Sequence, residues 1–243
     1  GLLFSRERSL THLTELGRLM QPHLKQVLEE SEAARTTAKS FLRLEDANLN
    51  LGVMCTVGPL RFAAFLCDFS QKHPGIDVRL LERAPGDLGE QLVQEKIDVA
   101  LAAKAGIFEE PLRLQPLYRE RFVVAFPAGH RFEQQKSVPL SAVEGESYLL
   151  RANCEYRDHI AGLRKDRGIE LRRVYVSERE DWIQAMVAAG LGICFMPEFT
   201  PPAPGGITRP VVDPVITRDV GLLTIAGRRH SPAVAAFIRA AQA

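Results

Sequence analysis

The sequence predicts an α/β protein in which two Rossmann-like lobes follow a long N-terminal helix. Three observations lead to this prediction. Apolar residues recur at alternating steps of three and four between residues 10 and 41, which is typical of a helix with one apolar seam. From residue 49 onward, short apolar runs alternate with amphipathic helical stretches, as in a parallel sheet covered by helices. This pattern starts again after a break at residues 127–130, so a second lobe of the same kind is expected.

The N-terminal helix is predicted to present an apolar seam on one side. Thr14 is the expected N-cap, because its hydroxyl can accept a hydrogen bond from an unpaired backbone N–H. Pro22 lies inside the pattern and is expected to kink the helix. Small Ser31 and Ala34 suit close contact between two helices, so we expect this helix to dimerise the chain; packing against its own domain is the alternative. The seam consists of Leu10, Leu13, Gly17, Met20, Leu24, Val27, Ser31, Ala34, Ala38 and Phe41.

The first lobe is expected to alternate strands and helices. Pro59 fits the first turn of its first helix, because a backbone N–H at that position would have no hydrogen-bond partner within the helix. Pro74-Gly75 is expected to end that helix. The predicted strands are residues 49–54, 76–81, 98–103, 112–117 and 122–126. The predicted helices are residues 60–73 and 88–97.

The second lobe is expected to repeat the alternation and then return the chain to the first. Residues 200–206, rich in proline and glycine, are predicted to form a loop. Crossings near Pro127 and Arg209 are expected to act as a hinge between the lobes. The predicted strands are residues 148–150, 174–176, 193–196 and 220–225, and the predicted helices are residues 155–167, 181–189 and 232–241. The expected divisions are a linker region at 1–46, lobe I at 47–127 and 210–243, and lobe II at 128–209.

Composition and motifs restrict the class of protein. Lys and Arg number 31 and Asp and Glu number 30, so no domain-wide basic field is available for nucleic acid. No C-x-x-C pair occurs, and free thiols point to a reducing compartment such as the cytoplasm. A secretory signal and a membrane-spanning apolar run are not expected. No catalytic, cofactor or metal-ligand pattern is found, so no enzyme activity, cofactor or metal is expected. The four cysteines are Cys55, Cys67, Cys154 and Cys194, of which Cys67 and Cys194 are expected in the core.

Two turns that join a strand to a helix make up the candidate effector site, one from each lobe. Thr56 and Asn153 lie just before predicted helices, whose N-termini favour negative charge; a simple N-cap is the alternative role for each. Arg151 can offer bidentate hydrogen bonds to a carboxylate. Clefts between lobes are common sites for small ligands. The predicted effector-binding residues are Cys55, Thr56, Val57, Arg151, Asn153, Cys154 and Ser177.

Cys154 has two interpretations. A thiol near a helix N-terminus, with Arg151 and Arg157 close in sequence, is expected to have a lowered pKa and to be oxidisable. Glu155 and Asp158 oppose that effect, and no second cysteine follows within a few residues to act as a resolving partner. The alternative is an inert small side chain, which is the commonest role of cysteine.

Several stretches, taken in order along the chain, resemble LysR-type transcription regulators. Residues 3–8 and 13–17 are similar to the wing and the entry of the linker helix in that family, and residues 51–59 are similar to the start of its effector-binding domain. The order and spacing of these stretches over the whole chain make the combination specific. Further motifs of that domain are resembled by His73-Pro74-Gly75-Ile76, Ile97-Asp98-Val99-Ala100 and Gly190-Leu191-Gly192-Ile193.

The resemblance implies a wing remnant and linker helix at residues 1–46, followed by an effector-binding domain at 47–243 with lobes like those of periplasmic binding proteins. It also implies an effector bound between the lobes and assembly into dimers or tetramers. The DNA-reading helix of the family would precede residue 1, so DNA contact is expected only through an absent N-terminal head. The position of Cys154 resembles that of the reactive cysteine in the family's peroxide sensors.

These observations together predict the regulatory region of a LysR-type transcription factor that senses a small polar or anionic effector in a cleft between the lobes. A thiol-based oxidant sensor that uses Cys154 is the first alternative. The second is a solute-binding protein of the same two-lobed architecture, which the heptad helix and the missing signal peptide disfavour. An enzyme on this scaffold is the third.

Overall fold

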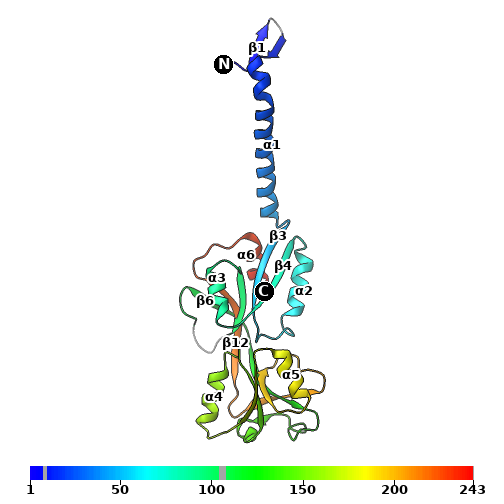
Figure 1. Cartoon of the computed structure of the whole chain (residues 1–243), viewed down its shortest axis with the longest axis vertical. Coiled ribbons are helices and arrows are strands. Elements are labelled where there is room, and N and C mark those ends of the chain that lie inside the picture. The colour runs from blue at the N-terminus through cyan, green and yellow to red at the C-terminus, as the bar shows by residue number, and fades with distance from the viewer. Residues whose placement is uncertain (8–9, 104–107, 243) are drawn as a thin grey trace. The chain divides into compact units, whose positions relative to one another are not determined.

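The computed structural model describes residues 1–7, 10–103 and 108–242. The chain forms two compact units, Gly1–Ala47 and Asn48–Ala243, and the boundary between them lies next to the end expected for the linker region. The second unit has the α/β fold that the sequence predicted, with helices packed around a mixed sheet (Figure 1).

The first unit is a β-hairpin followed by one long helix (Figure 1). Thr14 caps the helix as predicted, because its hydroxyl accepts a hydrogen bond from the Gly17 amide at 2.9 Å. The helix begins later than the seam indicated, since Leu10 and Leu13 lie in the second strand of the hairpin. The two strands pair antiparallel. The bounds are β1 (Phe4–Glu7), β2 (Leu10–Leu13) and α1 (Glu15–Arg43).

Helix α1 leaves its apolar side chains exposed. The helix continues past Pro22 to Arg43, and Gly17 is the only buried residue in this fully described helix. Leu24 and Val27, at the middle of the predicted seam, are 49% and 66% exposed. An amphipathic helix is usually stabilised by burying its apolar face. The face of α1 is therefore suited to contact with a second helix.

The second unit is built on a mixed sheet. Its strands follow the order β4-β3-β5-β12-β6-β11-β7, and β10 also pairs with β6. β3 and β5 are parallel, whereas β12 is antiparallel to both of its neighbours. β8 and β9 form a separate parallel pair. The strands are β3 (Ala47–Met54), β4 (Ile76–Arg83), β5 (Val99–Ala103), β6 (Leu112–Pro127), β7 (Val138–Pro139), β8 (Ser147–Arg151), β9 (Arg172–Ser177), β10 (Cys194–Pro197), β11 (Gly206–Val212) and β12 (Thr217–Ile225).

Strand β6 is one long strand where the sequence predicted two. It pairs with β12 as far as Arg121 and with β10 and β11 from Phe122 onward. Strand β11 was not predicted, because it begins in the loop expected at residues 200–206. Arg209 lies inside β11 and pairs with Val124 of β6. The expected crossings near Pro127 and Arg209 are therefore wrong in position. A continuous path of paired strands joins the two halves, so the division into lobes I and II stays a prediction; the two names are used below with the bounds given above.

Helices flank the strands of both lobes (Figure 1). Phe69 of α2 and Phe237 of α6 pack edge to face, with ring centroids 5.1 Å apart, and all of β5 is buried. A second core packs lobe II residues, among them Phe132, Ile160 and Phe195, against Phe122 and Phe126 at the end of β6. The helices are α2 (Ala63–Lys72), α3 (Asp87–Val93), α4 (Arg157–Lys165), α5 (Glu180–Ala188) and α6 (Pro232–Ala241), with a 3₁₀ turn at Leu140–Val143.

Two helices begin later than predicted, which matters for the site. α2 begins at Ala63 instead of residue 60, and α4 begins at Arg157 instead of residue 155. Their N-cap residues, Phe62 and Tyr156, make no side-chain capping hydrogen bond. In the part of the chain that the structure describes, no helix is long and apolar enough to cross a membrane.

Candidate functional site

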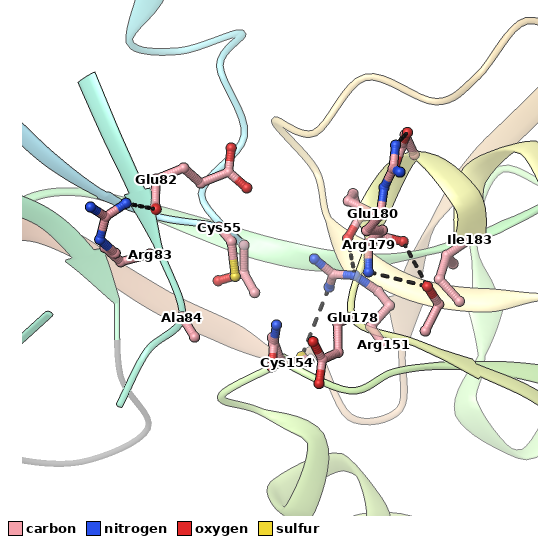
Figure 2. Close-up of a pocket in the computed structure, with 14 residues that line it drawn as sticks. Cys55, Glu82, Arg83, Ala84, Arg151, Cys154, Glu178, Arg179, Glu180 and Ile183 are labelled. Carbon is pink, nitrogen blue, oxygen red and sulfur yellow. Dashed lines mark hydrogen bonds and ion pairs between the residues drawn. The ribbon is translucent and has the colours of Figure 1, made fainter. Parts of the chain in front are cut away.

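A pocket of about 500 Å³ opens where the carboxyl ends of β3, β4, β8 and β9 meet the first turn of α5 (Figure 2). Ligands of open α/β sheets bind beyond the carboxyl ends of strands. The lining residues come from both predicted lobes: Cys55, Thr56, Glu82, Arg83, Ala84, Arg151, Asn153, Cys154, Ser177, Glu178, Arg179, Glu180, Asp181 and Ile183.

Six of the seven predicted effector-binding residues line this pocket, and Val57 does not. Val57 lines a separate, more apolar pocket beside α2. Sequence reasoning missed the charged residues at the end of β4 and around the start of α5. Glu82 and Glu178 follow the same rule as the residues that were found, since both lie at the end of a strand or just after one. The signal for them was therefore present in the predicted strands.

Arg151 is the most buried charged residue of the pocket, at 4% exposure. Its Nε donates to the Glu180 carboxylate, and its Nη1 contacts the Phe195 carbonyl at 3.4 Å and the Cys154 sulfur at 3.8 Å. Its Nη2 has no hydrogen-bond partner in the described part of the chain. Burial, the largest single influence, lowers the pKa of Arg151, but the charge and hydrogen bond of Glu180 together with the neighbouring Cys154 and Cys194 raise it overall, so the guanidinium stays charged. A buried donor without a partner is unfavourable, so the hydrogen bonding of this guanidinium is incomplete at Nη2.

The other charges of the pocket are divided between paired and unpaired groups. Arg179 pairs with Asp181 at 2.5 Å. Arg83 donates to the Gln91 side chain at 2.8 Å. Glu82 and Glu178 form no ion pair among the described residues, and Figure 2 shows their carboxylates on opposite sides of the pocket.

The helix N-termini that motivated the site are not where the sequence placed them. Neither Thr56 nor Asn153 caps a helix, because α2 and α4 begin several residues later. The simple N-cap role is therefore wrong for both residues. The reason given for their anion-binding role, a position at a helix N-terminus, is also wrong. The helix N-terminus that does reach the pocket is that of α5, through Glu180 and Asp181.

Thr56 instead belongs to a buried polar network that joins the two lobes. Its hydroxyl donates to Glu155 at 2.7 Å and accepts from Arg218 at 3.1 Å. Arg218, 1% exposed, also donates to the Thr56 carbonyl at 2.7 Å, to Glu120 at 2.8 Å and to Glu155. Gly58 allows the turn to approach lobe II, since a Cβ there would lie 2.2 Å from the Phe199 carbonyl oxygen. The network is called the Arg218 network below.

The Arg218 network holds one buried cation between two carboxylates. Burial raises the pKa of Glu120, and Arg218 opposes this rise. Glu155 is the member from lobe II, while Thr56 comes from the turn after β3. Such charges depend on each other, because an ion left alone in the interior is very unfavourable. The network therefore ties the relative position of the two lobes to one arginine.

Comparison with models of protein families shows which family the chain belongs to. Residues 43–243 match the model of the LysR substrate binding domain. This chain belongs to the LysR family. Its α/β fold is that of LysR effector-binding domains, as the sequence resemblance predicted.

The similar LysR proteins include a curated relative and two solved structures. The uncharacterized HTH-type transcriptional regulator YybE of Bacillus subtilis is 25% identical over 97% of this chain and 81% of its own length. A full-length OxyR of Pseudomonas aeruginosa superposes with a TM-score of 0.75, at 25% identity over 99% of this chain and 84% of that one. The effector-binding domain of QuiR in complex with shikimate has a TM-score of 0.72, at 22% identity over 82% of this chain and 96% of that one.

Burial raises the pKa of three of the four thiols of this LysR domain, those of Cys55, Cys154 and Cys194. Burial raises the pKa of Cys55 to about 11, with Glu82 adding to the rise and Arg151 opposing it. Burial also raises the pKa of Cys154, again against the effect of Arg151. Arg157, expected to activate Cys154, is paired with Asp158 at 2.9 Å. Cys194 is buried as predicted, whereas Cys67 is exposed and that prediction is wrong.

The slow reaction of Cys55 with an alkylating reagent is a testable consequence. The reactive form is the thiolate, and a rise in pKa from 9.0 to about 11 reduces the thiolate fraction at pH 7 roughly 100-fold. Iodoacetamide should therefore modify exposed Cys67 first and Cys55 and Cys154 much later, with their rates rising as pH increases. Peptide mass spectrometry over pH 6–10 measures each site. Rapid modification of Cys154 at pH 7 would instead support the oxidant-sensor alternative.

Proposed function

We propose that this chain is the effector-sensing regulatory region of a LysR-type transcription factor, and that its pocket binds a small molecule through an anionic group. One observation carries the proposal: the buried Arg151, which lines the pocket, has an Nη2 without a partner in the described part of the chain. A carboxylate oxygen of a ligand would complete its hydrogen bonds. The family name, substrate binding domain, supports a small-molecule role for this unit.

The Arg218 network supplies a route from the pocket to the arrangement of the lobes. Thr56 lines the pocket and also bonds to Glu155 and Arg218. A ligand beside Thr56 would favour one position of Glu155 over another, and with it one angle between the lobes. Ligands shift an equilibrium only through such a difference in interaction. The lobes would pass this change to the rest of the regulator.

Small-molecule sensing is favoured here over oxidant sensing. Relatives of this chain include the hydrogen peroxide-inducible genes activator of Escherichia coli O6:H1, 25% identical over 91% of this chain and 74% of its own length. Burial, however, raises the pKa of both Cys55 and Cys154, which works against a reactive thiolate. Arg151 opposes this rise in the pKa of both thiols without reversing it, whereas its unpartnered Nη2 supports a role in binding an anion.

Isothermal titration calorimetry tests the proposed function. The whole chain is titrated with a panel of small organic acids that carry one carboxylate, with and without hydroxyl or amino substituents. At least one acid should bind with one-to-one stoichiometry in this pocket. If no member of the panel binds, the pocket is not an anion site and the proposal is wrong.

The partners follow from the same proposal. Helix α1 joins two chains into a dimer, and dimers pair into tetramers. DNA is contacted through an N-terminal helix-turn-helix head, and the cytoplasm is the compartment where such a regulator would act on DNA.

Dimerisation by α1 predicts a change in oligomeric state. Replacing Leu24 and Val27 together with glutamate should shift the protein to smaller species, because burial of each such side chain is worth roughly 1.5–3 kcal/mol. Sedimentation velocity measures the species present. The matched control is Lys25→Glu and Glu29→Gln, on exposed positions of the same helix turn. An unchanged distribution for the apolar double variant would assign the dimer to another surface.

A further inference from the structure

The charges around the Arg151 pocket are unusual for a site that takes a simple anion. The lining carries four carboxylates against three guanidinium groups. Glu180 already neutralises part of the Arg151 charge, and Asp181 pairs with Arg179. A ligand that is only negative would gain one hydrogen bond from Arg151 while it met a surplus of negative charge.

Two of these carboxylates are free to bind a cation. Glu82, at the end of β4, and Glu178, just after β9, form no ion pair among the residues that the structure describes. In Figure 2 the Glu82 carboxylate points into the space opposite Arg151, and Glu178 lies next to Cys154 on the other side. Glu82, Glu178 and Arg151 all line this one pocket. One small molecule in the pocket is therefore within reach of both signs.

From this arrangement we propose that the ligand is a zwitterion of the amino-acid type, with its carboxylate on Arg151 and its ammonium group held by Glu82 and Glu178. This inference rests on the proposed function and narrows the class of effector. The ammonium group removes the repulsion that a plain acid meets, and it gives each free carboxylate a charge-assisted hydrogen bond. The buried Arg151 fixes the carboxylate end, while Glu82 from lobe I and Glu178 from lobe II approach the ammonium from two sides. The ligand thus bridges the lobes.

The inference is tested with three matched sets of probes on the whole chain by calorimetry. The first set is the protein amino acids. The second contains acids without the amino group, such as propionate, isocaproate and hydrocinnamate. The third contains the amines without the carboxylate: ethylamine, isoamylamine and phenethylamine. At least one amino acid should bind, and its two single-function analogues should bind at least about 10-fold more weakly, because each loses a charge-assisted hydrogen bond.

Variants separate this inference from the proposed function. Glu82→Gln with Glu178→Gln should weaken the amino acid roughly 10- to 100-fold and leave the plain acid unchanged or tighter. Both residues are exposed, so the fold is retained; Glu170→Gln, exposed and away from the pocket, is the control. Plain acids that bind as well as amino acids, with no effect of the double variant, overturn the zwitterion and leave the anion site standing. Binding by amines alone, or by no probe, overturns both.

Discussion

Replacing Arg218 with methionine should reduce the free energy of unfolding by about 3–5 kcal/mol. Glu120 and Glu155 would then be left in the interior without the cation that both contact. The hydroxyl and carbonyl of Thr56 would also lose the hydrogen bonds from Arg218, at 3.1 and 2.7 Å. Urea unfolding followed by circular dichroism measures the change.

A matched control for this prediction lies on the same pair of strands. Arg119 pairs with Asp219 at 2.7 Å, but the two side chains are 69% and 42% exposed. Exposed pairs contribute little, because water and salt screen them, so Arg119→Met should have a much smaller effect. Replacing Arg218, Glu120 and Glu155 together with apolar residues should recover part of the loss. Equal effects of Arg218→Met and Arg119→Met would show that the buried network does not join the lobes.

The second large effect concerns ligand binding. Arg151→Gln should weaken the tightest acid or amino acid roughly 100-fold, because the ligand loses a charge-assisted hydrogen bond and Glu180 is left without its partner. Arg151→Lys should recover only part of the affinity, since lysine keeps the charge but lacks the planar fork. Calorimetry of each variant at one salt concentration gives the dissociation constants.

A double variant separates loss of the donor from added repulsion. Arg151→Gln with Glu180→Gln removes both charges of the pair and keeps the pocket neutral at that point. The affinity of this double variant for the ligand should stay as low as that of Arg151→Gln, because both variants lack the Nη2 donor. Arg167→Gln is the surface control, because Arg167 is exposed, follows helix α4 and bonds to the Leu163 carbonyl of that helix. Wild-type affinity in the double variant would contradict the assigned role of Arg151.

Local patterns were enough to predict several elements of the fold. Helix α6 has the predicted bounds, Pro232–Ala241, because Ser231 and Pro232 mark its start and apolar residues recur at helical spacing. Strand β5 was found from its short apolar run, and it is buried throughout. Each of these signals lies within a few residues of the element that it defines. Tertiary contacts had little to add.

Elements that depend on distant partners were not predicted. The run Arg119-Glu120-Arg121 looks like a polar break between two apolar strands, yet it lies inside β6. Glu120 is tolerated there because Arg218 pairs with it from a strand 98 residues away in sequence. Strand β11 was not predicted, because its first residue, Gly206, was assigned to the loop at residues 200–206 and no strand was expected at residues 207–212, although the backbone of β11 pairs with β6.

The sequence brought together residues that line one pocket, but it did not predict the contacts that those residues make. The turns at the ends of β3 and β8 gave Cys55, Thr56, Arg151, Asn153 and Cys154, which line one pocket. The contacts of Arg151 with Glu180 and of Thr56 with Glu155 depend on how the elements pack. Sequence spacing holds no information on those pairs. The group proposed to bind the anion is therefore a buried guanidinium, because the helix N-termini first expected for that role begin several residues after Thr56 and Asn153.

A crystal structure of the chain with its tightest-binding acid or amino acid tests the central claim most directly. The account predicts a carboxylate in the pocket between β3, β4, β8 and α5, with one oxygen within hydrogen-bond distance of Nη2 of Arg151. Electron density for the ligand outside this pocket, or inside it without contact to Arg151, would contradict the account.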